Sequence, residues 1–288
     1  MVSRGDRSVA ISIVIPTRNS EATLENCLLS IRTQSVDSIE VIIVDNLSTD
    51  NTRAVAEHYG AKVITVGPQV SNFFAAPIQR RIGADKAIGE FLYFVDSDMI
   101  LLPGLLKECL SASAKSGALV VPEQSFGSGT WARVKIAERE CNVGDPSLEA
   151  PRFVSRAIYE KVGKWPQEAG AFDDWVFRDK LVAAGVIIGR TQNLVLHNEG
   201  ALKLTRLLRR KLVMGMSTNH FPRMSVEKRL RRMSPTRLLS LLSRLSSRRP
   251  DVLLPFLFMK TLEGVFFYEG RLIARNRQLP DGLWNAWD

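Results

Sequence analysis

Short apolar runs alternate with amphipathic stretches through the first half of the chain. The apolar runs are rich in β-branched residues and end in polar ones, which predicts strands over residues 11–15, 39–44, 62–66, 91–95 and 118–121. Between the first two runs, one helical face carries Leu24, Cys27, Leu28 and Ile31, and Ser20 is the expected N-cap. Strands that alternate with helices are typical of a mainly parallel sheet covered by helices. The sequence therefore predicts an α/β fold.

The same periodicity predicts more helices and two late strands. The helices are expected over residues 77–88, 103–115, 131–139, 156–162 and 173–184. Short strands are expected at 186–188 and 194–196. Pro77 and Pro103 fit a first helical turn, because the backbone N–H that proline lacks would have no intrahelical hydrogen-bond acceptor there. We divide the chain into an α/β domain over residues 1–202 and a helical, basic extension over residues 203–288.

Positive charge is concentrated in that extension. Residues 203–249 hold fourteen Lys and Arg against one acid, whereas the whole chain has a net charge of +9, so the rest is slightly acidic. One helical face there carries Leu238, Leu241, Leu242 and Leu245, and a second apolar segment over 252–267 is interrupted by Pro255, Lys260 and Glu263. Two interpretations fit: an amphipathic element at an anionic membrane surface, or leucines packed on the domain with arginines in water. Nucleic acid is not an expected partner, because no aromatic platform or reader motif accompanies the charge.

Cysteine usage and hydropathy bear on the compartment. The three widely spaced cysteines are typical of buried core residues in a reduced, cytosolic protein. The apolar run over 9–15 is too brief for a signal peptide, and the run over 252–259 is far short of the roughly 20 residues that cross a bilayer. We expect a cytoplasmic protein, with peripheral attachment to the inner face of the membrane as the alternative.

Acidic residues follow two of the predicted strands directly. Asp45 comes after residues 39–44, and Asp96 and Asp98 come after residues 91–95. In open α/β sheets ligands bind outside the carboxyl ends of the strands, and paired carboxylates suit Mg²⁺ or Mn²⁺. Taken alone, Asp96-Ser-Asp98 is equally well explained as a strand-ending turn with a helix cap, and Asp45-Asn-Leu-Ser-Thr-Asp50 is better explained as a turn followed by a capped helix.

Two further candidates lie later in the chain. Asp173 and Asp174 open the predicted helix 173–184, where the helix dipole stabilises carboxylates as anions. They fit either a charged first turn or a catalytic acidic pair. His197 directly follows the strand predicted at 194–196 and fits either a structural role or a role near a metal.

Several motifs in combination resemble the family 2 glycosyltransferases. The resemblance spans residues 9–200 and rests on Ile13-Val-Ile-Pro-Thr-Arg-Asn19, Ile43-Val-Asp-Asn-Leu-Ser-Thr-Asp50, Gly83-Ala-Asp-Lys-Ala-Ile-Gly89 and Phe94-Val-Asp-Ser-Asp98. It implies the GT-A fold, a Rossmann-like, mostly parallel sheet flanked by helices.

The resemblance also implies roles for the candidate residues. The nucleotide base and ribose would be held by Pro16, Thr17, Asn19 and Asp45. Asp96 and Asp98 would hold Mn²⁺ or Mg²⁺ and the donor diphosphate, with His197 near the metal. Arg80 would bind the nucleotide, although Arg81 stands where relatives often have Asn. Asp174 would deprotonate the acceptor hydroxyl, with Asp173 as its neighbour.

The expected activity is therefore metal-dependent, inverting transfer of one sugar from a nucleoside-diphosphate sugar. A UDP-sugar is favoured over a GDP- or dTDP-sugar, and no Gln-x-x-Arg-Trp element follows the acidic pair to indicate processive synthesis. The His197-Asn-Glu-Gly200 element followed by a basic tail suggests a lipid-linked or membrane-surface glycan as acceptor. The alternatives are a nucleotidyltransferase, which would usually show a glycine-rich phosphate loop after the first strand, and an inactive membrane-associated scaffold. The donor sugar, the linkage and the oligomeric state stay open.

Overall fold

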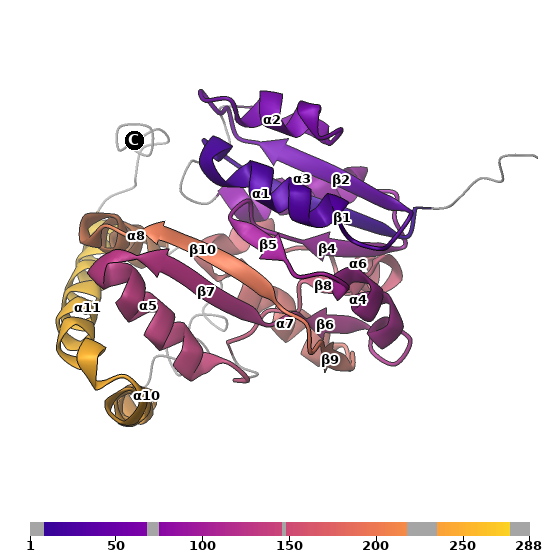
Figure 1. Cartoon of the computed structure of the whole chain (residues 1–288). Coiled ribbons are helices and arrows are strands. Elements are labelled where there is room, and N and C mark those ends of the chain that lie inside the picture. The colour runs from indigo at the N-terminus through magenta and orange to yellow at the C-terminus, as the bar shows by residue number, and fades with distance from the viewer. Residues whose placement is uncertain (1–8, 68–74, 146–147, 218–234, 277–288) are drawn as a thin grey trace, which may run out of the picture.

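The computed structural model describes residues 9–67, 75–145, 148–217 and 235–276. Its centre is a seven-stranded sheet with the order β3-β2-β1-β4-β8-β6-β9 (Figure 1). The strands are β1 Ile11–Thr17, β2 Ile39–Asp45, β3 Lys62–Thr65, β4 Phe91–Phe94, β6 Ala118–Val120, β8 Phe153–Ser155 and β9 Ile188–Arg190. Only β8 runs against its neighbours β4 and β6, whereas the other pairs are parallel. The predicted, mainly parallel α/β fold is confirmed.

Helices cover both faces of this sheet. One face packs against α1 Glu21–Arg32, α2 Thr52–His58 and α4 Leu105–Ser113, and the other against α3 Ala75–Lys86, α6 Arg156–Lys161 and α7 Asp173–Ala183. Successive side chains of β1 alternate between the two cores, with Ile13 and Ile15 in the first and Val14 in the second. Burial on both faces explains why the parallel strands are continuous apolar runs in the sequence.

A second, three-stranded sheet was predicted only in part. It consists of β5 Met99–Leu101, β10 Val195–Ala201 and β7 Glu123–Ser128, with β10 in the middle. β7 has the sequence Glu-Gln-Ser-Phe-Gly-Ser, which has no apolar alternation, and it is extended because it pairs in parallel with β10. The expected strand at 194–196 continues to Ala201 for the same reason. This small sheet holds His197 next to Met99, directly after the Asp96 to Asp98 turn.

The C-terminal helices pack on the domain beside the small sheet (Figure 1). They are α8 Leu204–Ser217, α10 Pro235–Arg248 and α11 Leu253–Asn276, and they gather around α5 Gly129–Asn142. Leu241 and Leu245 of the predicted leucine face are buried against α5, as the packing interpretation expects. Residues 218–234, which hold part of the basic segment, lie outside the described residues.

The long helix α11 crosses α8 at very short range. A Cβ on Gly270 would lie 2.0 Å from the carbonyl oxygen of Leu212, and one on Gly215 would lie 2.0 Å from that of Phe267. Glycine at both positions therefore lets the two backbones touch. Pro255 lies in the first turn of α11, where proline is tolerated, and the helix is continuous through it.

The described residues also bear on the expectations about cysteines and membrane spans. Cys27, Cys109 and Cys141 are buried free thiols, as predicted. Among the described helices, none combines the length and the hydropathy needed to cross a bilayer.

Candidate functional site

A cavity of about 920 Å³ opens where β1 and β4 of the large sheet meet β7 and β10 of the small one. This volume lies in the range of pockets that hold small-molecule ligands. Seven of the residues predicted for the site line it: Pro16, Thr17, Asn19, Asp96, Asp98, Asp174 and His197. The fold therefore brings side chains from four separate stretches of sequence to one cavity.

The other three predicted residues lie behind the wall of the cavity. Asp45, Arg80 and Asp173 are between 0% and 6% exposed and are absent from the lining. Both oxygens of Asp45 accept hydrogen bonds within the protein, Oδ1 from the hydroxyl of Thr17 at 3.0 Å and Oδ2 from the amide of Ser48 at 2.9 Å. In this structure Asp45 thus shapes the turn after β2, and its neighbour Asn46 lines the cavity instead.

Arg80 joins the two acidic elements from behind. Its Nη2 donates to Asp96 Oδ1 and its Nη1 to Asp173 Oδ2, both at 2.5 Å. The ring of Trp165 supports the guanidinium, with its centroid 5.3 Å away, and Trp165 Nε1 donates to Asp173 at 2.8 Å. Paired and hydrogen-bonded in this way, the buried charges are compensated. Asp173 therefore has its contacts inside the protein and not in the cavity.

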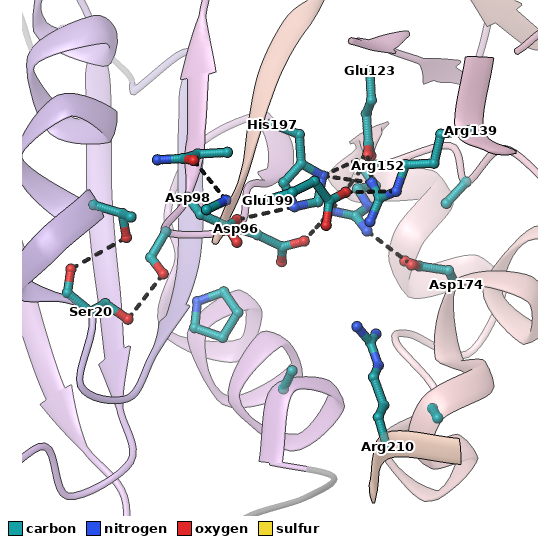
Figure 2. Close-up of a pocket in the computed structure, with 18 of the residues that line it drawn as sticks. Ser20, Asp96, Asp98, Glu123, Arg139, Arg152, Asp174, His197, Glu199 and Arg210 are labelled. Atoms are coloured by element: carbon teal, nitrogen blue, oxygen red, sulfur yellow. Dashed lines mark hydrogen bonds and ion pairs between the residues drawn. The ribbon is translucent and has the colours of Figure 1, made fainter. Parts of the chain in front are cut away.

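Arg152 joins the same two elements from the cavity side. Its Nη1 donates to Asp96 Oδ2 at 2.7 Å, and its Nη2 donates to Asp174 Oδ2 at 2.9 Å. Burial raises the pKa of Asp96, but Arg152 and Arg80 outweigh it and hold that pKa well below its usual range. Asp96 is therefore ionised, with Arg80 on one oxygen and Arg152 on the other. Figure 2 draws Asp96 and Arg152, on the cavity side of this arrangement.

His197 and Asp98 lie next to each other in the wall of the cavity. His197 Nε2 lies 3.4 Å from Asp98 Oδ1, which is buried and has no hydrogen-bond partner in the described structure. On the other side of the ring, Nδ1 lies 3.1 Å from Oε2 of Glu123. Burial lowers the pKa of His197, but Asp98 and Glu123 outweigh it and raise that pKa to about 10.

The Asp98 and His197 pair fits a divalent metal. An oxygen and a nitrogen 3.4 Å apart can both reach one ion at about 2.1 Å, and a carboxylate on the far ring nitrogen is the usual support of a metal-bound histidine. No group of three or more His, Cys, Asp or Glu side chains arranged to hold a metal occurs in the described parts of the chain. The remaining ligands would have to come from elsewhere, as they do where Mg²⁺ binds substrate phosphates.

The structure adds four charged residues that the sequence did not indicate as site residues. Glu123, Arg139, Arg152 and Glu199 all line the cavity. Arg139 donates to Glu199 at 2.8 Å and lies 3.2 Å from Glu123, so it holds the acids that surround His197. Glu123 belongs to a strand whose extent comes from pairing with β10, so no sequence pattern marked it, whereas Glu199 falls within the His197-Asn-Glu-Gly200 element without having been assigned to the site. Arg152 lies just upstream of the acidic pair, in Ala150-Pro-Arg-Phe153, and its position there was the available signal.

Comparison with known proteins assigns the chain to a class. Residues 12–166, more than half of the chain, match the model of glycosyl transferase family 2. The protein therefore belongs to glycosyl transferase family 2, as the motifs indicated.

Curated relatives match over shorter stretches. The putative glycosyltransferase EpsH of Bacillus subtilis is 34% identical over 115 residues, which are 39% of this chain and 33% of that protein. The GalNAc(5)-diNAcBac-PP-undecaprenol beta-1,3-glucosyltransferase of Campylobacter jejuni is 30% identical over 112 residues, which are 38% and 36% of the two chains. The chain thus spans about a third of the length of these relatives.

Solved structures share the fold over almost the whole chain. Residues 1–349 of Staphylococcus aureus TarS in complex with UDP superpose with a TM-score of 0.53 at 16% identity, covering 95% of both chains. The mannosyltransferase PcManGT of Pyrobaculum calidifontis in complex with GDP-Man and Mn²⁺ gives a TM-score of 0.51 at 16% identity, covering 96% of this chain and 78% of the other. At this identity the likeness shows the fold, which is the GT-A fold that the motifs implied.

Proposed function

We propose that the protein transfers a single sugar from a nucleoside-diphosphate sugar to an acceptor hydroxyl, with inversion at the anomeric carbon and with the help of a divalent metal. The observation that carries the proposal is the convergence of Asp98, His197 and Asp174 on one cavity in a member of this family. Family membership favours glycosyl transfer over nucleotidyl transfer, and the presence of all three side chains speaks against an inactive scaffold.

The donor end of the cavity is proposed to lie at the carboxyl end of β1. Pro16, Thr17 and Asn19 line it and would contact the base and ribose. Asp45 would act through Thr17, from whose hydroxyl it accepts a hydrogen bond. Arg80 would act through Asp96, with which it forms an ion pair. A UDP-sugar is the proposed donor, with GDP- and dTDP-sugars as the alternatives.

Asp98 and His197 are the proposed metal ligands, with Asp96 beside them. Each oxygen of Asp96 already accepts a hydrogen bond from an arginine, so Asp96 would coordinate the ion only through a remaining lone pair. Mn²⁺ or Mg²⁺, when bound, supplies positive charge that offsets the charge growing on the leaving nucleoside diphosphate. Glu123 keeps the imidazole oriented by its contact with Nδ1.

Asp174 is the proposed general base. Its Oδ2 accepts from Arg152, whereas its Oδ1 is buried and has no hydrogen-bond partner in the described structure. A buried acceptor atom without a partner is costly, and an acceptor hydroxyl would satisfy it. Asp174 takes the proton of that hydroxyl as its oxygen attacks the anomeric carbon and the sugar-phosphate bond breaks. A single displacement of this kind inverts the configuration. Asp173 would position Arg80.

A panel of UDP-, GDP- and dTDP-sugars with Mn²⁺ or Mg²⁺ tests the proposal. Thermal stabilisation by one nucleotide in the presence of metal, followed by release of that nucleotide with an acceptor, is the expected result. Stabilisation by none of the nucleotides with either metal would overturn it.

We also propose that the C-terminal helices bring the domain to an anionic membrane surface, on the cytoplasmic side, where a lipid-linked or membrane-surface glycan is the acceptor. Supporting this, α11 exposes large apolar side chains, among them Leu254 at 78%, Phe258 at 55% and Tyr268 at 59%. The adjacent α8 and α10 carry seven of the fourteen basic residues of the segment 203–249. Apolar side chains beside basic ones are the combination that favours an interfacial position.

A further inference from the structure

Two arginines of α8 reach the cavity from the C-terminal extension. Arg206 and Arg210 are one helical turn apart, so they lie on the same face of α8, and both line the cavity. Arg209, between them in the sequence, does not line it. The extension therefore contributes directed positive charge to the cavity and not only charge to the surface.

These two guanidinium groups differ from the other arginines of the cavity in their partners. Arg152 and Arg139 each bind two or more carboxylates, which compensate their charge. Within the described parts of the chain, the guanidinium groups of Arg206 and Arg210 make no hydrogen bond or ion pair with another residue, although both backbones take part in helix α8. Two like charges one turn apart on a helix repel each other, and an anion between them would remove that repulsion.

The position of α8 separates this pair from the proposed donor end. The helix packs against the turn η1 Gln167–Phe172, which leads directly into Asp173 and Asp174. Figure 2 shows Arg210 extending from α8 on the Asp174 side of the cavity, with Ser20 of the donor end on the opposite side. An anion held by the two arginines would therefore enter beside the proposed base and away from the donor nucleotide.

We propose that Arg206 and Arg210 bind a phosphate group carried by the acceptor substrate. Guanidinium groups bind phosphate through paired N–H donors, and two of them one turn apart can share its oxygens. Leu202 and Leu207 line the cavity beside them, so an apolar chain attached to the phosphate would also find contacts there. The inference rests on the proposed function, because it takes Asp174 as the point where the acceptor hydroxyl binds.

The test titrates two phosphate monoesters, octyl phosphate below its micelle concentration and glycerol 3-phosphate, into protein saturated with Mn²⁺ and UDP, or the nucleotide that the panel selects. Calorimetry measures binding to the wild type and to the variants R206Q/R210Q, R206K/R210K and R209Q. All of the altered side chains are exposed, so the fold should persist, and thermal unfolding checks this.

We expect the wild type to bind at least one ester and R206Q/R210Q to bind it at least about tenfold more weakly, the loss typical of one charged hydrogen bond. R209Q, the matched control, should stay within about twofold of the wild type, and R206K/R210K should fall between. Tighter binding of octyl phosphate assigns the phosphate to a lipid, and equal binding assigns it to a polar glycan or polyol.

The inference would be overturned if the wild type bound neither ester, or if R206Q/R210Q bound the ester as tightly as the wild type. A tenfold loss of nucleotide affinity in R206Q/R210Q would also overturn it, because the two arginines would then bind the donor nucleotide and not the acceptor. Nucleotide affinity itself is measured first in each titration. If the proposed function is wrong, the wild type will not bind the nucleotide. If only the phosphate site is wrong, the wild type will bind the nucleotide but not the phosphate esters.

Discussion

Arg152 Nη2 donates to Asp174 Oδ2 over 2.9 Å, and this contact fixes the proposed base in the cavity. The same guanidinium holds Asp96, so the proposed metal end and the proposed acceptor end of the site share one side chain. Burial lowers the pKa of Arg152, but Asp174, Asp96 and Glu123 outweigh it and raise that pKa well above its usual value. The residue is therefore a permanent cation between three acids.

Replacing Arg152 should separate its positioning role from its charge. R152K keeps the charge but cannot bridge two carboxylates, so we expect kcat to fall about 10- to 100-fold while the nucleotide still binds. R152M leaves Asp174 without its charged partner and removes one of the two guanidinium groups on Asp96, so it should lower the free energy of unfolding by about 3 kcal/mol. Urea unfolding and steady-state kinetics measure both effects. Wild-type kcat in R152K would contradict the positioning role.

Substitutions of Asp98 and Asp174 should impair different steps, nucleotide binding in the first case and sugar transfer in the second. D98A removes a proposed metal ligand and should abolish the metal-dependent part of nucleotide binding. D174N should leave nucleotide binding intact but lower transfer by about 10² to 10⁴, the usual contribution of a general base. D37N, at an exposed position on the α1 to β2 connection, is the matched control for both. Full transfer by D174N would move the base to another residue.

Glu123 should make the metal-free protein sensitive to acid. Burial raises its pKa, but Arg152, His197 and Arg139 outweigh it and lower that pKa from 4.5 to about 2. Since the folded-state pKa is lowered, the stabilisation by Glu123 is complete above about pH 4.5 and is lost as the pH falls toward 2. The difference in free energy of unfolding between the wild type and E123Q should therefore shrink from pH 6 to pH 3. A difference that grows over this interval would contradict the assignment.

The crossing of α8 and α11 should tolerate no side chain at Gly270. A methyl group there would lie 2.0 Å from the Leu212 carbonyl, so we expect G270A to lower the free energy of unfolding by about 1 to 3 kcal/mol. Gly264, in the same helix, has open space around its missing Cβ. G264A is the control and should stabilise the protein by up to about 1 kcal/mol, because alanine favours helix. Chemical denaturation of both variants decides the point.

Exposed side chains of α11 should carry membrane association. L254S/F258S should weaken binding to vesicles that contain anionic lipid, and raised salt should weaken binding of the wild type. V182S, at an equally exposed valine on α7, is the control and should bind like the wild type. Co-sedimentation with vesicles measures each case. A wild type that ignores the vesicles at low salt would contradict the proposal.

The sequence predicted β1, β2, β3, β4 and β6 of the large sheet because each is a continuous apolar run, but it did not predict β8, and β9 begins two residues later than expected. Ile13, Val14 and Ile15 show why such runs are apolar, since neighbouring side chains enter different cores. The polar strand β7 could not be predicted, because it is extended only through its hydrogen bonds with β10. For the site, the acids after β4 and at the start of α7 were visible as motifs. That Asp45 and Asp173 turn inward, and that Arg152 bridges to Asp174, depends on side-chain packing that no spacing encodes.

The close crossing of α8 and α11 has a consequence for engineering acceptor specificity. Because α8 both lines the cavity and touches α11 backbone to backbone at Gly215 and Gly270, its angle depends on a helix whose described residues do not line the cavity. A chimera that took α8 alone from a relative would change the crossing angle between α8 and α11. Arg206 and Arg210 would then be displaced from their positions in the cavity wall. Exchange of α5, α8, α10 and α11 as one module should preserve the crossing and move the proposed acceptor end together with it.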